Sequence, residues 1–481
     1  MLNREKIEFI LKKIISLLRE DAHYSGGYSS YILLLLFFKW LSDLHSKDIS
    51  KNKKFSENFT LPKKANWVYI KDLVHNIGEE LTNIFSLIEK WNPSLQGVFI
   101  NPSINQWEKL SDNILQSMIR ELSVLDFNEN SLKRPDLLGE IYEDLIVKSG
   151  LYDMKSNVNC FTPYDLRKLI IELVQPQSGM QIYDPACGSG GMLTEAARYL
   201  KEHSKDPQEI SLWGQEEDYE LRSIASINLL LYGVVHAKIL SGSIIKNLLV
   251  EEEGKPQKFD VVITNPPFGV KNWEDYESKQ NAAHHFEYGY PPKSSADYVF
   301  IQRVLAMLTD IGKAAMILPH GVLFRGGTEG EIRENIVKND LIEAVIGLPQ
   351  NLFHTTKIAT AIIIFNKQKI EDRKQKILFI DASHEYGSNR KQNFLTDEII
   401  SRITSTYSDF REEANYSRIV LSEEISKYGY ILAISRYVES KRVKSELDVN
   451  SQIKKMQELE AQRCEIEAQM NECLKSLGIK I

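Results

Sequence analysis

The sequence predicts a doubly wound α/β domain, with an all-helical domain before it and a heptad-patterned helix after it. Three observations lead to this prediction. From about residue 165, short apolar runs alternate with helical patterns. The first 125 residues instead repeat apolar positions at a spacing near 3.6, as in KIEFILKKIISLLRE. The last residues place apolar side chains in alternating steps of three and four.

Seven apolar runs in the middle of the chain predict the strands of a parallel sheet. Each run is short, apolar and bounded by turn residues or by a helical pattern. Strands that alternate with helices form a parallel sheet that is covered by helices on both faces. The runs are residues 180–184, 212–217, 237–240, 259–264, 313–319, 341–349 and 360–366.

The chain is long enough for several domains, since 481 residues allow roughly three at about 150 residues each. We assign residues 1–130 to the helical domain, 131–410 to the α/β domain and 411–481 to a C-terminal region. The run YILLLLFF at 31–38 is strongly apolar, but a membrane span needs about 20 such residues. We therefore expect a buried core helix there and no membrane association.

The composition is that of an ordinary soluble globular protein, with 43% hydrophobic and 26% charged residues. The net charge of −7 argues against a protein that grips nucleic acid alone over a large surface. The cysteines Cys160, Cys187, Cys464 and Cys473 form no CxxC pair. We therefore expect neither a metal site nor a disulfide framework, and a cytoplasmic location.

The segment DPACGSGGM follows the first predicted strand and opens a helix. Its glycines Gly188, Gly190 and Gly191 allow a tight turn and a close approach of the backbone to a ligand, as in the nucleotide-binding turn of such folds. Asp184 ends this strand and Glu216 ends the next, where an acid commonly holds ribose hydroxyls. The glycines alone would also fit a plain strand-to-helix turn. Together with the two acids they favour an adenosine-containing cofactor.

The segment Asn-Pro-Pro-Phe stands where the apolar run 259–264 ends. Two prolines terminate strand pairing and stiffen the backbone. The side-chain carbonyl of Asn265 and the backbone carbonyl of Pro266 could hold the hydrogens of an exocyclic amine, which is otherwise a poor nucleophile. Pro267 adds rigidity, and Phe268 can stack on a base that has been taken out of a duplex. The alternative is a proline turn that caps a strand, with a core phenylalanine.

Together, DPACGSGGM and NPPFG resemble the amino-methyltransferases that use S-adenosylmethionine. Further stretches closely resemble the modification (M) subunit of type I restriction-modification systems, from about residue 5 to 400. They are YILLLLFFKWLSD, FTP at 161–163, SADYVFIQRVLAML at 295–308, LPHGVLFRGGTEGEIR at 318–333 and VIGLPQNLF at 345–353. The resemblance implies a Rossmann-like methyltransferase fold and methylation of the N6 amine of adenine in DNA, with S-adenosylmethionine as the cofactor.

The resemblance also implies partners and site residues. The partners are DNA, a specificity (S) subunit that binds two M subunits, and a restriction (R) subunit in the full complex. Catalysis falls to Asn265, Pro266, Pro267 and Phe268, with no metal. The residues implied to bind the cofactor are Asn159, Cys160, Phe161, Thr162, Pro163, Asp184, Gly188, Ser189, Gly190, Gly191 and Glu216.

Two positions depart from the family's pattern. Before FTP the family usually has glycine and an aromatic residue, whereas this chain has Val158, Asn159 and Cys160. After the third strand the family tends to have Gly-Asp, whereas this chain has Gly242 and Ser243. A stiffer backbone and a lost acceptor near the adenine pocket would weaken cofactor binding. Neither departure touches the Asn-Pro-Pro-Phe segment.

Two other features carry weaker expectations. His284 and His285 lie in a polar loop, and we expect no metal there because adjacent histidines rarely both ligate one ion. The segment Arg325-Gly326-Gly327 fits a contact with phosphate and a solvated turn equally well.

The last helix, which we place at 449–477, carries a heptad seam broken by one arginine. Such a seam packs either on the chain's own body or on a helix of a partner, and we expect a partner, the specificity subunit. The seam residues are Met456, Leu459, Arg463, Ile466, Met470, Cys473 and Leu477.

Two other functions fit part of the pattern. An Asn-Pro-Pro-aromatic segment can also methylate a glutamine amide in a protein, but the large helical region and the terminal heptads argue against a protein glutamine N5-methyltransferase. A non-catalytic assembly subunit with a decayed pocket is the other alternative. The intact Asn-Pro-Pro-Phe segment argues against it.

Overall fold

The computed structural model describes most of the chain, which divides into two compact units, residues 1–438 and 439–481. The described residues are 3–20, 28–46, 59–100, 107–127, 137–148, 161–203, 211–245, 257–273, 286–353, 357–389 and 392–439, with isolated positions between 456 and 470.

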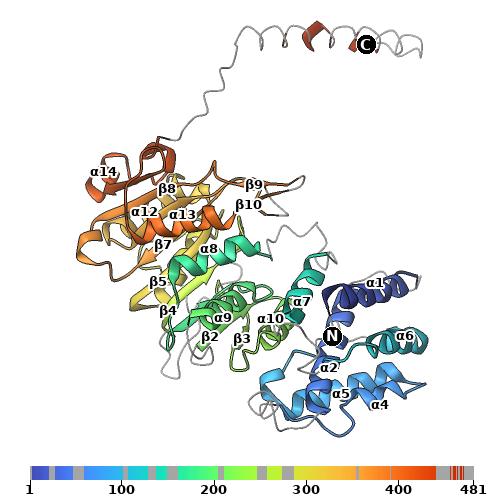
Figure 1. Ribbon diagram of the computed structural model, residues 1–481. Coiled ribbons are helices and arrows are strands. Elements are labelled where there is room, and N and C mark those ends of the chain that lie inside the picture. The colour runs from blue at the N-terminus through green and yellow to red at the C-terminus, as the bar shows by residue number, and fades with distance from the viewer. Residues whose placement is uncertain are drawn as a thin grey trace. The chain divides into compact units, whose positions relative to one another are not determined.

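A nine-stranded sheet forms the centre of the first unit (Figure 1). The seven strands expected from the sequence are all present in it, and β8 and β11 are additional. In spatial order the strands are β11 (Ser417–Leu421), β8 (Lys376–Asp381), β6 (Ile342–Gly347), β7 (Thr360–Asn366), β5 (Leu308–Pro319), β4 (Phe259–Thr264), β1 (Gln181–Asp184), β2 (Ser211–Glu216) and β3 (Lys238–Ser241).

The sheet is mostly parallel, as expected, but two strands run the other way. Strand β7 is antiparallel to both of its neighbours, β5 and β6. Strands β6 and β7 follow each other with no helix in the described part of their connection, so the chain turns back beside β6 instead of crossing over the sheet. Strand β11 is antiparallel to β8 at the edge of the sheet.

Helices cover both faces of the sheet, because successive side chains of its inner strands are buried in opposite directions. Val261 and Ile263 of β4 pack in one core, and Val262 between them packs in the other. Helices α8 (Tyr164–Val174), α9 (Gly191–His203) and α13 (Asp397–Ser408) cover the first face. Helices α11 (Asp297–Met307), α12 (Thr328–Lys338) and α14 (Ser422–Lys427) cover the second.

The N-terminal part is helical, as expected, and has its own core. Residues 31–38 are all buried within one helix, so the prediction of a core helix there is confirmed. None of the helices in the described part of the chain combines the length and the apolar character that a membrane span requires. The α-helices of this part are α1 (Arg4–Glu20), α2 (Tyr28–Ser46), α4 (Trp67–Lys71), α5 (Ile77–Trp91), α6 (Asp112–Leu122) and α7 (Leu137–Lys148).

Helix α10 (Tyr219–Leu231) belongs to two cores at once. Ala225 and Leu229 pack with the helices on one face of the sheet. Ile224 and Ile227 pack in the core of the N-terminal helices. The side chain of Ser223, also on α10, donates to the backbone carbonyl of Val98. The helical region and the α/β region therefore share a continuous buried boundary.

The regular structure continues beyond residue 410, where the sequence places the end of the α/β domain. Strand β11 and helix α14 follow, and the first compact unit extends to Val438. In the second unit, the described residues Met456, Leu459 and Ile466 are helical and exposed. The seam residues Cys473 and Leu477 lie outside the described residues.

Candidate functional site

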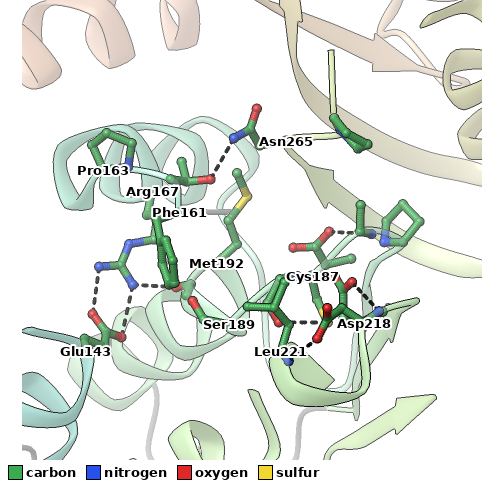
Figure 2. A pocket seen from close by; sticks show the side chains of 18 of the residues that line it. Glu143, Phe161, Pro163, Arg167, Cys187, Ser189, Met192, Asp218, Leu221 and Asn265 are labelled. Carbon is green, nitrogen blue, oxygen red and sulfur yellow. Dashed lines mark hydrogen bonds and ion pairs between the residues drawn. The ribbon is translucent and has the colours of Figure 1, made fainter. Parts of the chain in front are cut away.

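A cavity of about 860 Å³ opens at the carboxyl ends of β4, β1 and β2 (Figure 2). These three strands are neighbours and parallel, so their last residues meet at the same edge of the sheet. The predicted site residues that line the cavity are Phe161, Thr162, Pro163, Asp184, Gly188, Ser189, Gly191, Glu216, Asn265 and Pro267. Asn159 and Cys160 lie outside the described residues.

The glycine-rich segment forms a tight turn between β1 and α9. Gly188 and Gly190 have φ angles of 54° and 79°, in the left-handed region that favours glycine. The Gly190 N–H donates to the carbonyl of Cys187 at 2.8 Å, which closes the turn. A Cβ atom on Gly190 would lie 3.2 Å from the Cα of Ala225 in α10. Gly190 does not line the cavity, but it lets the turn sit against α10.

Two acids stand at the ends of β1 and β2. Glu216 accepts hydrogen bonds from the backbone N–H groups of Gly188 and Asp218, each at 2.9 Å. Asp184 accepts one from the N–H of Ala186 at 3.1 Å. Burial raises the pKa of Glu216, and it raises the pKa of Asp184 to about 7, because the charged form is poorly solvated there. Asp184 is therefore close to half ionised at neutral pH.

The side-chain amide of Asn265 lies at the end of β4, and its two polar atoms differ in their hydrogen bonds within the described part of the chain. Its Nδ2 donates to the Thr162 hydroxyl at 3.0 Å, which fixes the orientation of the amide. Its Oδ1 is buried and accepts no hydrogen bond from the described residues. A buried carbonyl without a partner is costly unless a ligand supplies the donor. The two segments to which the sequence gives separate roles, FTP and Asn-Pro-Pro-Phe, thus meet directly.

The remaining residues of the Asn-Pro-Pro-Phe segment differ in whether they line the cavity. Pro267 lines the cavity, whereas Pro266 and Phe268 do not. The Phe268 ring meets Phe353 edge to face, with 6.1 Å between ring centroids. Phe353 is buried and ends the stretch VIGLPQNLF, yet the sequence provides no reason to place it beside Phe268.

A small hairpin, β9 (Gly387–Ser388) with β10 (Asn393–Phe394), adds a wall that the sequence did not predict. Asn389, Gln392, Asn393 and Phe394 line the cavity. The chain after the hairpin is held to the start of α8, because Asp165 accepts a hydrogen bond from the N–H of Leu395 at 2.6 Å. No short motif marks this hairpin.

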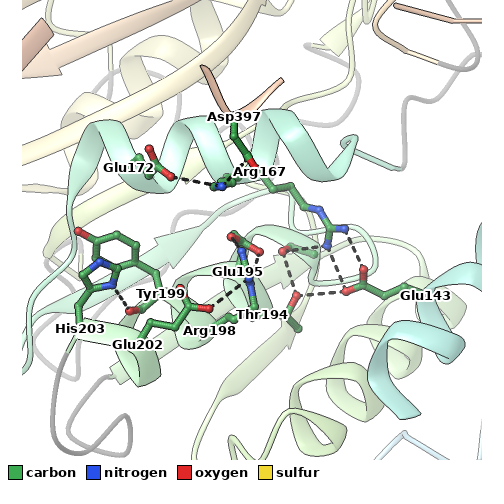
Figure 3. A network of polar contacts seen from close by, with 12 residues as sticks. Glu143, Arg167, Glu172, Thr194, Glu195, Arg198, Tyr199, Glu202, His203 and Asp397 are labelled. Atoms are coloured by element: carbon green, nitrogen blue, oxygen red, sulfur yellow. Dashed lines mark hydrogen bonds and ion pairs between the residues drawn. The ribbon is translucent and has the colours of Figure 1, made fainter. Parts of the chain in front are cut away.

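The sequence also did not predict a cluster of polar side chains behind the glycine-rich turn. Glu143 and Arg167 form an ion pair at 2.8 Å beside the cavity, and both line it (Figures 2 and 3). Glu143 lies on α7 and Arg167 on α8, in helices that read from sequence as ordinary amphipathic segments.

Arg325, whose role the sequence left open, is committed to two acids. Its guanidinium forms ion pairs with the buried carboxylates of Asp297 and Glu329. These contacts join the turn before α12 to the first turns of α11 and α12. His284 and His285 lie outside the described residues, and no group of three or more potential metal ligands occurs in the part of the chain that the structure describes.

Comparisons with known proteins agree with this geometry. Residues 133–446 match the family model described as N-6 DNA methylase, and residues 7–122 match that of the HsdM N-terminal domain. The type I restriction enzyme MjaVIII methylase subunit of Methanocaldococcus jannaschii is 33% identical, over 95% of this chain and 83% of that protein. The HindI methylase subunit of Haemophilus influenzae is 28% identical, over 87% of this chain and 100% of that protein.

A solved structure is similar over nearly the whole fold. It is the methyltransferase subunit of a type I restriction-modification system from Streptococcus thermophilus. Its TM-score is 0.76 at 26% sequence identity, covering 90% of this chain and 99% of that one.

We expect Gly190→Ala to destabilise the protein more than Gly179→Ala. Both glycines have left-handed φ angles, 79° and 86°, so each substitution carries a conformational cost of about 1–2 kcal/mol. At Gly179 no atom lies within 4 Å of the added Cβ, whereas at Gly190 the backbone of α10 is in the way. Denaturant unfolding of the two variants measures the difference. Equal losses would mean that the close approach to Ala225 imposes no constraint.

Proposed function

The chain belongs to the N-6 DNA methylase family, and we propose which side of its cavity binds the cofactor and which side binds the target base. As a type I restriction enzyme methylase subunit, it is an adenine-specific, S-adenosylmethionine-dependent DNA methyltransferase. The β1–β2 side binds the cofactor. The end of β4 holds the amine of a target adenine. The observation that carries the proposal is the buried Oδ1 of Asn265, which accepts no hydrogen bond from any residue that the structure describes.

The residues of the β1–β2 side fit S-adenosylmethionine. The cavity has a volume in the range of small-molecule sites, about 300–1,000 Å³. Glu216 ends β2 and lines the cavity, as a ribose-binding acid should. Asp184 offers a carboxylate to a positively charged ligand. The proposed contributions of Asn159 and Cys160 remain predictions from the family resemblance.

Asn265 and Pro266 would act on the adenine amine. When bound, S-adenosylmethionine supplies an electrophilic methyl group. The amine lone pair is delocalised into the ring, so the amine needs acceptors that hold its hydrogens and turn the lone pair toward the methyl group. The Oδ1 of Asn265, oriented by Thr162, is such an acceptor. The backbone carbonyl of Pro266 would be the second. Positioning of this kind supplies much of an enzyme's rate.

Phe268 would stack on the adenine once the base has left the duplex. Its ring is partly buried and is supported from one side by Phe353. The family membership favours a DNA substrate over a glutamine side chain and over a non-catalytic role. A DNA substrate would place the protein in the cytoplasm.

The second compact unit would join this subunit to a specificity subunit, in a complex of two M subunits per S subunit to which a restriction subunit can add. Its described residues support an interaction surface. Met456, Leu459, Ile466 and Met470 are helical and more than half exposed, at 63%, 57%, 64% and 52%. Apolar residues in this heptad pattern normally pack against another helix.

We predict that Asn265→Ala lowers the methylation rate at least about a hundredfold, the usual effect of losing one preorganised hydrogen-bonding group. Cofactor affinity should stay nearly unchanged, because Asn265 is assigned to the amine. Thr162→Val should give a smaller loss of rate, since it frees the amide without removing it. Calorimetry with S-adenosylmethionine and a DNA methylation assay check both. A near-normal rate for Asn265→Ala would refute the proposed mechanism.

Cofactor affinity should fall as the pH is lowered through 7. The pKa of Asp184 is raised by burial to about 7, so the carboxylate that would face the positively charged cofactor is lost below that pH. If only the ionised form binds, affinity at pH 6 is about tenfold weaker than at pH 8. Asp184→Asn should bind weakly and without this pH dependence. A flat profile for the unmodified protein, measured by calorimetry, would remove Asp184 from cofactor binding.

Deleting residues 449–481 should leave a folded protein that binds S-adenosylmethionine but no longer assembles with its specificity subunit. A matched pair of point variants sharpens the test. Leu459→Lys places a charge in the apolar seam, whereas Glu460→Lys places the same charge at the neighbouring helical position outside it. Light scattering with the partner should show weakened assembly only for Leu459→Lys. Undiminished assembly of the truncated chain would exclude this segment as the contact.

A further inference from the structure

The carboxylate of Glu143 lies where four helices meet behind the glycine-rich turn (Figure 3). Its Oε2 accepts a hydrogen bond from Arg167 Nη2 at 2.8 Å. Its Oε1 accepts from Arg167 Nη1 at 3.1 Å, from Asn228 Nδ2 at 3.2 Å and from the Thr194 hydroxyl at 3.3 Å. These partners come from α8, α10 and α9, and Glu143 itself comes from α7.

The charge on Glu143 is maintained by this setting. Burial alone would raise the pKa of the carboxyl group, but the Arg167 guanidinium and the hydrogen bonds from Asn228 and Thr194 hold it below its ordinary value. Glu143 is therefore ionised at neutral pH, and its charge balances that of the largely buried Arg167.

The donors that hold Glu143 also hold the backbone of the turn. Arg167 Nη1 donates to the carbonyl of Gly191 at 3.2 Å. The Thr194 hydroxyl lies 2.9 Å from the same carbonyl and shares its single proton between this carbonyl and Glu143 Oε1. Asn228 Nδ2 donates to the carbonyl of Ser189 at 3.2 Å. A Cβ on Gly191 would lie 2.6 Å from Arg167 Nη1, so the guanidinium lies directly against the turn. The carboxylate thus fixes the donors, and the donors fix two carbonyls of the turn.

Helix α7 is anchored outside the α/β region. Leu138, Ile141 and Tyr142 are buried in the core of the N-terminal helices, each with an exposed fraction of 1% or less. Glu143 follows Tyr142 directly and points the other way, toward the turn. Glu143 therefore links the position of α7 in the N-terminal core to the turn.

We propose that Glu143 is a positioning residue for cofactor binding, which holds the 188–191 turn in its binding geometry through Arg167 and Asn228 and ties that turn to the N-terminal helical core. The inference rests on the proposed binding of S-adenosylmethionine at this turn. It assigns to the N-terminal helices a part in setting cofactor affinity, although Glu143 and Asp144, in the middle of α7, are the only described residues of these helices that line the cavity.

The test compares Glu143→Gln and Asn228→Ala with the control Glu140→Gln in the full-length chain. Glu143→Gln keeps the shape of the side chain but removes the negative charge that balances Arg167. The guanidinium is then no longer held against the turn by an ion pair. Asn228→Ala removes one link to Ser189 without leaving a charge unbalanced. Glu140 is one turn earlier on α7, where its carboxylate faces Arg4 and not this network.

Calorimetry should show a dissociation constant for S-adenosylmethionine at least about tenfold higher for Glu143→Gln, and a smaller rise for Asn228→Ala. In the assembled complex, KM for the cofactor should rise while kcat stays nearly unchanged. This combination indicates the loss of an interaction that stabilises the ground state and the transition state equally. Glu140→Gln should match the unmodified protein in both measurements.

Unchanged cofactor affinity in both Glu143→Gln and Asn228→Ala would overturn the proposal, and so would a rise equally large in Glu140→Gln. If Glu143→Gln does not fold, Asn228→Ala decides alone, with thermal unfolding as proof that it is folded. If the unmodified chain itself fails to bind S-adenosylmethionine, the proposed function fails, and that outcome is separate from a failure of the variants alone.

Discussion

The parallel alignment of β4, β1 and β2 is the constraint on which the site depends. Residue pairing places Ile182 of β1 opposite Val261 of β4, and Asp184 opposite Gly214 of β2. Because all three strands run the same way, the residues at their carboxyl ends meet at the same edge of the sheet. Acids from β1 and β2 and the amide from β4 then share one cavity, although they are far apart in sequence. Slipping any of these strands by one residue would turn its side chains to the opposite faces.

The surroundings shift the pKa values of acids in the same cavity in opposite directions. Asp184 is buried and Glu216 is half-buried, and backbone N–H groups donate to both. These hydrogen bonds compensate only part of the cost of ionisation, so burial raises the pKa of each carboxyl group. Glu143 is half-buried, but the Arg167 guanidinium outweighs the effect of burial and lowers the pKa of this carboxyl group. On the side of the cavity proposed for the positively charged cofactor, the ionised forms of Asp184 and Glu216 would thus be stabilised by a bound cation. The ion pair behind the turn is already neutralised and can act as a fixed support.

The apolar patterns of the sequence predicted most of the strands and helices, but they did not predict the contacts between segments that are distant in the chain. All seven expected strands are present, most of them as buried apolar runs. The edge strand β3 was predicted although none of its residues is buried, and β8 was missed although its inner residues are buried and apolar. Strand β11 is half-exposed at an edge and gives a weaker signal, and the direction of β7 follows from its connection rather than from its composition. Asn265 was recognisable because its neighbours are unusual. Its contact with Thr162, and the place of Glu143 in the helix sequence IYEDL, have no mark in spacing or composition.

Helix α10 determines where this chain can be cut into fragments or joined to parts of its relatives. One side of it covers the sheet and the other completes the core of the N-terminal helices. A fragment that began after those helices would present Ile224, Ile227 and Leu231 to water as a contiguous apolar strip, a surface that promotes aggregation. Exchanging the N-terminal helices between relatives would need α10 to travel with them, although it is encoded within the α/β region. The whole span to Val438 is therefore the unit to keep intact, and a cut for fusion or exchange belongs after it.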